Sequence, residues 1–189
     1  MAKTKPTPIV QEGDPVLRAI APAVSLSDIG GKELNDILAK MNAALDREAD
    51  GVAIAAPQIG VSLRIFIVSR KAFGVEEEGG EHIDPSTIPE RNMVFINPEI
   101  LKSSRKKVEV PEGCLSVRWL YGNTKRHEKV TVRAYDEFGK AFTYGGSGLV
   151  AQIFQHETDH LNGILFIDHA SDIEELSPEQ IAEIEARSK

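Results

Sequence analysis

The sequence predicts a mixed fold of helices and short strands, built as one domain over residues 1–189. Apolar residues recur at helical spacing between residues 34 and 45, which is the pattern of an amphipathic helix. Short runs rich in Ile, Val and Phe, bounded by turn residues, predict strands. These runs are residues 64–68, 93–96, 130–135 and 141–144, the last two forming a hairpin about residues 136–139.

Composition and charge exclude several classes of function. The net charge of −7 argues against nucleic-acid binding by bulk electrostatics, while leaving a localised basic patch open. A single cysteine allows no internal disulfide, which suits a reducing compartment. No run approaches the ~18 apolar residues of a membrane span, and residues 1–10 lack the apolar centre of a signal peptide. We therefore expect a cytoplasmic protein with no membrane segment.

The N-terminal quarter predicts a helical turn followed by a helix. Residues 14–18 place Pro15 at the first position of a short turn, where proline is favoured. Residues 25–28 offer caps for the longer helix, although the Gly30-Gly31 pair leaves its start uncertain. The helix repeats apolar residues that we assign to the core: Leu34, Ile37, Leu38, Met41 and Leu45.

Two stretches before residue 92 read as irregular backbone. Residues 51–60 are rich in small side chains, which let another chain approach closely, and include the neutral amide donor Gln58 beside a turn. Such a stretch forms either a packed loop or one wall of a site. Residues 71–91 are acidic and turn-rich, so we expect a solvated loop with His82 as a surface histidine.

A further strand leads to the lone cysteine. Residues 107–110 alternate like a strand and run into Cys114. A lone cysteine is commonly an inert small apolar residue, but its position after Glu-Gly at a strand end also permits a ligand role. Toward the C-terminus, residues 164–167 predict a final strand. Residues 177–179 predict the cap of a C-terminal helix with a thin apolar stripe of Ile181 and Ile184.

Residues 155–163 carry the pattern HExxH. On a helix, His156 and His160 lie about one turn apart on one face, so both imidazoles can bind one metal ion, with Glu157 beside them to move protons. Ser147 is placed to cap this helix, and Gly163 to end it in a left-handed conformation. The alternative is a helix whose two histidines and glutamate are only polar surface.

The third metal ligand is not set by the helix itself. The position where a metzincin places its third histidine is Phe166, which rules that class out. A thermolysin-like site would use a downstream carboxylate, for which Glu174 and Glu175 are available with little chain left for a second domain. Cys114 remains, and its thiolate is a strong ligand for borderline metals.

Three segments together resemble the ordered motifs of the peptide deformylase family. The motifs are residues 51–58, 112–116 and 155–160, and the likeness continues through residues 96–100, 129–133 and 161–168. The resemblance implies an α+β fold in which antiparallel strands pack around a central HExxH helix, with an N-terminal and a C-terminal helix. It implies removal of the N-formyl group from formyl-methionine at the start of nascent polypeptides.

The resemblance also implies a role for particular residues. Cys114, His156 and His160 would bind one divalent metal ion, most often Fe²⁺ in the family, with Zn²⁺ or Ni²⁺ as substitutes. Glu157 would move the proton of the attacking water, while the Gln58 amide and the Leu115 N–H would stabilise the formyl oxygen. A substrate strand and its methionine would contact the remaining residues: Val52, Ala53, Glu112, Gly113, Leu149 and Ile153. The partners would be N-formylmethionyl peptides near the ribosome exit.

The chain departs from the family pattern in three places. Ala53 stands where glycine is usual. The segment after Ser116 usually continues Val-Pro, whereas this chain has Val117-Arg118-Trp119-Leu120-Tyr121, which places bulk and charge at the expected rim. The loop 71–91 is longer than the family's shortest forms. Two other functions stay open at this point: a zinc endopeptidase with a carboxylate ligand, and a degenerate protein that only binds peptide N-termini.

Overall fold

Two antiparallel sheets enclose one helix. The computed structural model describes residues 7–75 and 84–187. The first sheet has the order β1-β2-β3-β6-β7 and the second β4-β5-β8. The strands are β1 (Ala53–Ala55), β2 (Ile65–Val68), β3 (Met93–Ser103), β4 (Lys107–Cys114), β5 (Val117–His127), β6 (Lys129–Tyr135), β7 (Ala141–Ser147) and β8 (Ser171–Glu175). The helices are α1 (Lys32–Leu45), α2 (Gly148–Leu161) and α3 (Pro178–Arg187).

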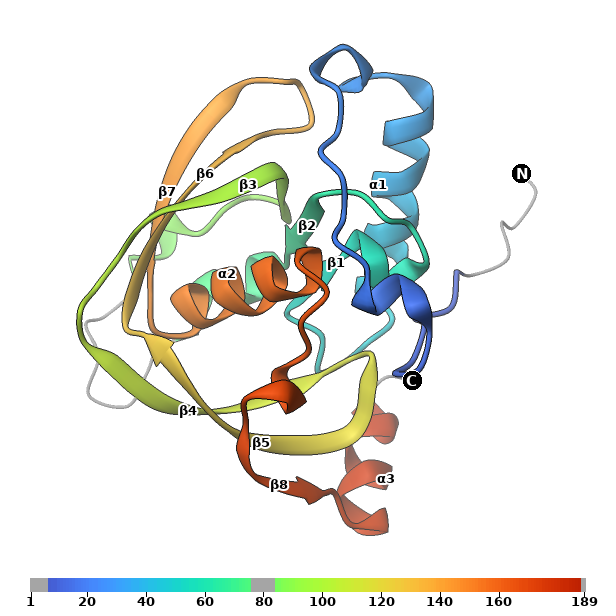
Figure 1. The fold of residues 1–189 in the computed structure, drawn as a ribbon, viewed down its shortest axis with the longest axis vertical. Coiled ribbons are helices and arrows are strands. Elements are labelled where there is room, and N and C mark those ends of the chain that lie inside the picture. The colour runs from blue at the N-terminus through green and yellow to red at the C-terminus, as the bar shows by residue number, and fades with distance from the viewer. Residues whose placement is uncertain (1–6, 76–83, 188–189) are drawn as a thin grey trace.

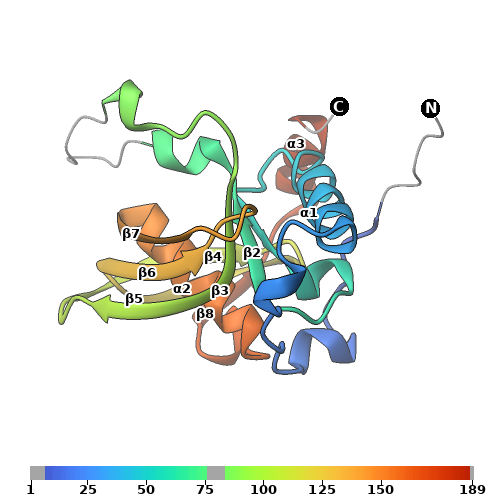
Figure 2. The same cartoon turned by 90° about the horizontal axis from the view of Figure 1, so that it is seen from above.

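Helix α2 occupies the centre of the molecule. It contacts β1, β2, β6 and β7 of the larger sheet and β5 of the smaller one (Figure 1). Seen from above, α1 lies toward one end of the molecule (Figure 2). The predicted α+β class, the antiparallel strands and the three helices are therefore confirmed.

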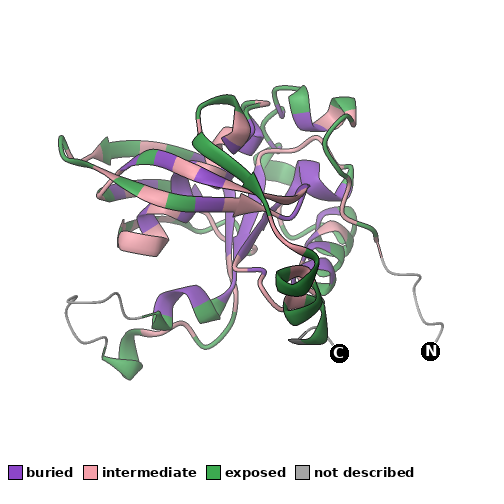
Figure 3. Cartoon of the chain, turned by 90° about the horizontal axis from the view of Figure 1, so that it is seen from below, coloured by how far each residue is buried: buried purple, intermediate pink, exposed green. Residues whose placement is uncertain are grey.

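The core explains why α2 is held so firmly. Phe66 of β2 and Phe95 of β3 stack with ring centroids 4.7 Å apart, and Phe154 of α2 lies 5.1 Å from Phe95. All three side chains are fully buried, and buried residues gather along these elements (Figure 3). A buried aromatic side chain contributes several kilocalories through area alone, so this contact orients the helix against the larger sheet.

Helix α1 begins later than the sequence predicts. Ser25 precedes a separate turn of 3-10 helix, Leu26–Asp28, and its side chain makes no capping hydrogen bond. Gly31 stands at the N-cap of α1, after Gly30 reverses the chain with φ at +83°. The expected caps at residues 25–28 therefore belong to that turn, because the two glycines separate it from the helix.

The strand predicted at residues 164–167 is wrong. Leu165 and Phe166 are buried, but the chain turns into a 3-10 helix, Phe166–Asp168. Asp168 closes this turn by accepting a hydrogen bond from the Leu165 N–H at 2.9 Å. A short apolar run does not distinguish a buried turn from a strand. The last strand is instead β8, whose residues are exposed.

The expected solvated loop at residues 71–91 is only partly solvated. Arg70–Gly74 forms a 3-10 helix in which Ala72 and Phe73 are buried, with Phe73 packed edge-on against Tyr144. His82 lies outside the described residues. At the other end of the chain, Ser177 Oγ accepts from the Gln180 N–H at 3.3 Å while Gln180 Oε1 accepts from the Ser177 N–H. This reciprocal pair confirms the predicted cap of α3.

The end of α2 gives a stability prediction. Gly163 has φ at +74°, and a Cβ there would lie 2.5 Å from the carbonyl oxygen of Arg18. Gly139, with φ at +79°, would place a Cβ no nearer than 3.7 Å from Ile29. We expect Gly139→Ala to lower the free energy of unfolding by ~1–2 kcal/mol from left-handed strain. Gly163→Ala should lower the free energy of unfolding by the same strain and by a further ~1–3 kcal/mol, because the added methyl is too close to the backbone of Arg18.

Urea unfolding of both variants at matched metal content measures the difference. Equal losses in the two variants would show that the backbone of residue 18 moves aside freely.

Candidate metal centre and active site

One cavity gathers nearly all the predicted site residues. It has a volume of about 310 Å³ and lies where β1, β4 and α2 meet. Of the twelve residues expected at a site, only His160 is absent from the lining of this cavity. Its Nε2 lies 3.2 Å from the sulfur of Cys114, which does line the cavity. The lining includes Val52, Ala53, Gln58, Glu112, Gly113, Cys114, Leu115, Leu149, Ile153, His156 and Glu157.

Cys114, His156 and His160 form a group that can hold a metal ion. One ligand atom from each lies within 4.8 Å of the others, and Cys114 Sγ is 3.2 Å from His160 Nε2. Tetrahedral bonds of ~2.0–2.3 Å place neighbouring ligand atoms roughly 3.3–3.8 Å apart. A thiolate with two imidazoles suits Fe²⁺, Zn²⁺ and related ions. The donor atoms therefore fit the kind of ion that the sequence predicts.

The two histidines differ in their surroundings. Burial, with the charge of His156, lowers the pKa of His160, so this imidazole is neutral and able to act as a ligand. Burial also favours neutral His156, but the Cys114 sulfur and the Glu112 carboxylate outweigh it and raise the pKa of His156. Metal ligands give up protons on binding, so a cation would take the place of that proton.

Glu157 presents a buried carboxylate to the cavity. Only 4% of the residue is exposed, and Oε2 has no hydrogen-bond partner among the described residues. Burial raises the pKa of Glu157 to about 7, although the charge of His156 opposes the shift. An unpaired buried carboxylate is costly and is commonly found where a reaction uses it.

Gln58 faces the same cavity from the other side. Its Oε1 accepts a hydrogen bond from the Ala55 N–H at 2.7 Å, which turns Nε2 toward the metal group. Nε2 lies 3.6 Å from Cys114 Sγ and donates to Ser116 Oγ at 3.2 Å. The side chain is 1% exposed, so its orientation is set by the backbone. Residues 51–60 thus form a wall of the site, as one of the two sequence interpretations held.

Gly113 and Tyr121 make the opposite wall. A Cβ at Gly113 would lie 2.4 Å from the ring of Tyr121, which also lines the cavity. Glycine is therefore required here for close packing, not for a special φ angle. The charge expected at the rim is not free, because Arg118 pairs with Asp50 and Glu48. The rim at residues 118–121 is bulky, as expected, but its cation is already neutralised.

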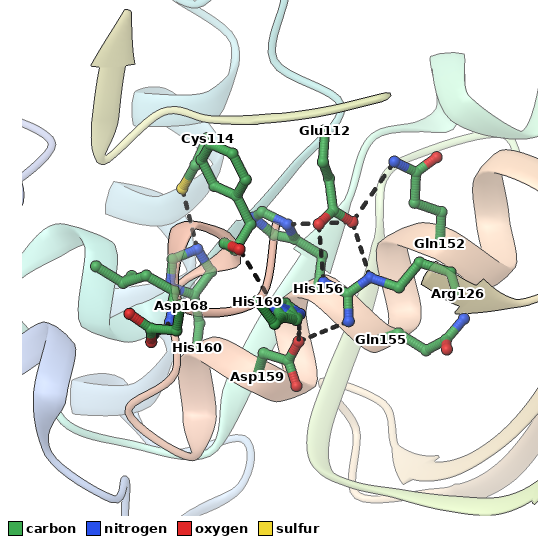
Figure 4. Close-up of polar contacts among 12 residues, drawn as sticks. Glu112, Cys114, Arg126, Gln152, Gln155, His156, Asp159, His160, Asp168 and His169 are labelled. Carbon is green, nitrogen blue, oxygen red and sulfur yellow. Dashed lines mark hydrogen bonds and ion pairs between the residues drawn. The ribbon is translucent and has the colours of Figure 1, made fainter. Parts of the chain in front are cut away.

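A buried ion network behind the site was missed from the sequence. Glu112 accepts from Arg126 Nε at 3.0 Å and Nη2 at 2.9 Å, and Arg126 Nη1 lies 2.6 Å from Asp159 (Figure 4). His156 Nδ1 is 3.6 Å from Glu112 Oε1, so charge rather than a good hydrogen bond links them. Arg126 and Glu112 are fourteen positions apart on the paired strands β5 and β4, where Arg126 lies opposite Val108, so the long arginine side chain has to reach along the hairpin to Glu112.

The charges of this network settle the state of Glu112. Burial alone would raise the pKa of its carboxyl, but His156 and Arg126 outweigh that effect and lower it to about 2. The Glu112 side chain is therefore an anion in this network. The contact with a substrate strand, which the resemblance implies for residue 112, is left to its backbone. The Arg126 side chain is 7% exposed and that of Glu112 is 3% exposed, so this ion pair is far more buried than the ion pairs at the protein surface.

Removal of Arg126 should destabilise the fold strongly. Arg126→Leu leaves Glu112 and Asp159 without their cation, and breaking a buried pair costs about 3–5 kcal/mol. The matched control is Arg133→Leu, which breaks a 2.6 Å pair with Glu99 whose side chains are both 58% exposed. There we expect a loss below about 1 kcal/mol. Denaturant unfolding measures both, and similar small losses would contradict the role given to the network.

The fold and the site together define the class: an α+β protein in which one cysteine and two histidines are placed to hold a metal ion beside a buried carboxylate. Comparison with known proteins narrows this class. The model of the family described as polypeptide deformylase matches residues 6–176, and the chain belongs to this family. Its enzymes remove the N-formyl group from nascent polypeptides.

Several peptide deformylases resemble the chain closely. One from Thermomicrobium roseum is 40% identical over 164 residues, covering 87% of this chain and 85% of that protein. One from Dehalococcoides mccartyi is 39% identical over 164 residues, covering 86% of this chain and 85% of that protein. A class I type b peptide deformylase from Acinetobacter baumannii, solved with Met-Ala-Ser bound, is 35% identical with a TM-score of 0.73. That match covers 88% of this chain and 100% of the other.

Proposed function

We propose that this chain hydrolyses the N-formyl group of N-terminal formyl-methionine in newly synthesised polypeptides, releasing formate. The observation that carries the proposal is the placement of Glu157 and of the Cys114, His156 and His160 group at one cavity in a chain of the polypeptide deformylase family. The carboxylates that a zinc endopeptidase would need, Glu174 and Glu175, are exposed in β8. The cysteine-containing group supports the deformylase instead.

One divalent ion, held by Cys114, His156 and His160, is part of the proposal. Such an ion, when bound, acts as a Lewis acid that activates water and polarises a carbonyl oxygen. Fe²⁺ is the ion we propose, with Zn²⁺ or Ni²⁺ able to substitute. Anaerobic purification followed by metal analysis identifies it.

The protein groups around the ion divide the remaining work. Glu157 accepts the proton of the attacking water and returns it to the leaving amine, a task for a buried carboxylate with a free oxygen. The Gln58 amide and the Leu115 N–H donate to the formyl oxygen as negative charge develops on it. Gln58 is suited to this because Ala55 already holds its Oε1, leaving Nε2 as a fixed donor.

Two edge strands beside the cavity support an extended mode of substrate binding. Strand β1 is at the edge of the larger sheet and β4 at the edge of the smaller one, and both contribute residues to the cavity. A peptide can add to such edges through its backbone. We place it between Val52-Ala53 and Glu112-Gly113, with Leu149 and Ile153 of α2 against the methionine. The Met-Ala-Ser complex of the Acinetobacter relative is consistent with a peptide ligand of this kind.

The cellular location of the reaction is a further part of the proposal. We propose that residues 1–189 act as one catalytic domain in the cytoplasm, on nascent peptides near the ribosome exit, without direct nucleic-acid binding. Within the described part of the chain, no helix is long and apolar enough to cross a membrane.

The role of Glu157 is tested by Glu157→Gln. The amide keeps the size of the side chain but cannot accept the proton, so formate release from a formyl-Met peptide should fall by at least about 10²–10⁴-fold at unchanged metal content. Glu109→Gln makes the same chemical change on the exposed face of β4 and should leave the rate unaltered. Near-normal formate release by metal-loaded Glu157→Gln would overturn the assignment.

The role of Ala53 is tested by Ala53→Gly. Its methyl lines the cavity but is largely buried in the cluster that contains Phe66 and Phe154. Removing it should raise kcat/KM for formyl-Met peptides, near the lower end of the roughly 10–200-fold range for a methylene-sized change, with little gain for a minimal formyl substrate. Ala55→Gly, in the same strand but outside the lining, controls for glycine in a strand. Identical kinetics for parent and Ala53→Gly at every substrate length would show that the methyl is not in contact with the peptide.

A further inference from the structure

Arg118 joins the two walls of the cavity. It is the second residue of β5, four residues after Cys114, and its guanidinium reaches across to the segment before β1. Nη1 lies 2.6 Å from Asp50 Oδ2, while Nη2 lies 3.2 Å from Asp50 Oδ1 and 2.8 Å from Glu48 Oε2. A bidentate contact to one carboxylate plus a bond to a second holds the planar group in a single orientation.

The environment of this contact makes it stronger than a surface ion pair. The Arg118 side chain is 16% exposed, against 24% for Asp50 and 30% for Glu48. The guanidinium carbon also lies 4.5 Å from the centroid of the Trp119 ring, a cation–π distance. Partial burial reduces screening by salt, and the ring limits the rotamers of the arginine. The contact is therefore built to keep two segments at a constant separation.

Both segments border the place where we put the substrate. Asp50, Gly51 and Val52 line the cavity on the β1 side. On the β4 side the lining is Gly113, Cys114, Leu115 and Tyr121. A peptide that pairs with two strand edges needs them about two strand spacings apart, each ~4.7–4.9 Å. A small change in that separation weakens the backbone hydrogen bonds on one side.

We propose that Arg118 is a positioning residue that sets the width of the peptide cleft, through Asp50 and Glu48, and so governs the affinity for the residues that follow formyl-methionine. This inference rests on the proposed function for its substrate. It assigns no part in the chemical step to Arg118, because the guanidinium is occupied by two carboxylates.

The test compares Arg118→Gln and Arg118→Lys with the parent enzyme on two substrates, formyl-Met-Ala-Ser and N-formylmethionine amide. For Arg118→Gln we expect KM for the tripeptide to rise about 10-fold, which equals ~1.4 kcal/mol, with kcat within about 2-fold. The short amide should show little change, since it lacks the residues that span the cleft. Arg118→Lys keeps the positive charge but lacks the planar guanidinium, so its KM for the tripeptide should lie between those of the parent and Arg118→Gln.

Two more variants separate positioning from simple stabilisation. Asp50→Asn should reproduce the effect of Arg118→Gln, because it weakens the bidentate contact while keeping its shape. Arg133→Gln breaks an exposed pair of the same 2.6 Å length, remote from the lining, and should leave both substrates unaffected. Equal losses of kcat/KM for the tripeptide and the short amide in Arg118→Gln, or unchanged kinetics for both, would overturn the proposal. A variant that does not fold is replaced in this comparison by Asp50→Asn.

Calorimetric binding of the unformylated peptide Met-Ala-Ser keeps this inference separate from the reaction. Absence of formate release by the parent would refute the proposed function alone. Weaker peptide binding in Arg118→Gln than in Arg133→Gln would still support the cleft-width role. Equal peptide affinity in the parent and both variants would refute that role even if the parent releases formate.

Discussion

The buried contact of Arg126 with Glu112 and Asp159 is the constraint on which the site depends. It joins β5, β4 and α2, three elements that carry or adjoin the metal-binding residues. Gln155 reinforces the same junction by exchanging two hydrogen bonds with the backbone of His127. A buried charge is costly once it loses its partner. A shift of α2 along the smaller sheet would separate these partners, so the network resists it. Cys114 and the two histidines thereby meet at ligand distance.

The opposite side of α2 is held by a different force. Phe154 packs into the aromatic cluster of the larger sheet, where shape and buried area set the position of the helix. One face of the helix is thus fixed by apolar packing and the other by ions. Between these two attachments Glu157 keeps a carboxylate oxygen that has no hydrogen-bond partner in the described part of the chain, a local cost that the surrounding structure is rigid enough to sustain.

The cleft combines rigid and adjustable parts. Gln58 is fixed by a hydrogen bond within its own turn, and Gly113 by the ring of Tyr121. The segment at residues 48–52 is attached to the other wall by the side chain of Arg118. The contact of Arg118 with Asp50 and Glu48 thus lies at the rim of the cavity, apart from the group formed by Cys114, His156 and His160.

The sequence alone determined the local chemistry, and tertiary structure decided its environment. Helical spacing placed His156 and His160 on one face, and three ordered motifs indicated Cys114, because each of these signals is contained within a few consecutive residues. The buried turn at residues 166–168 and the true start of α1 were not predictable, since an apolar run or a capping residue does not reveal what packs beside it. Likewise Glu112 with Arg126, and Arg118 with Asp50, are separated along the chain by a hairpin or by half its strands. Their pairing depends on how the hairpin, α2 and the segment before β1 pack together, and this packing exists only once the whole chain has folded.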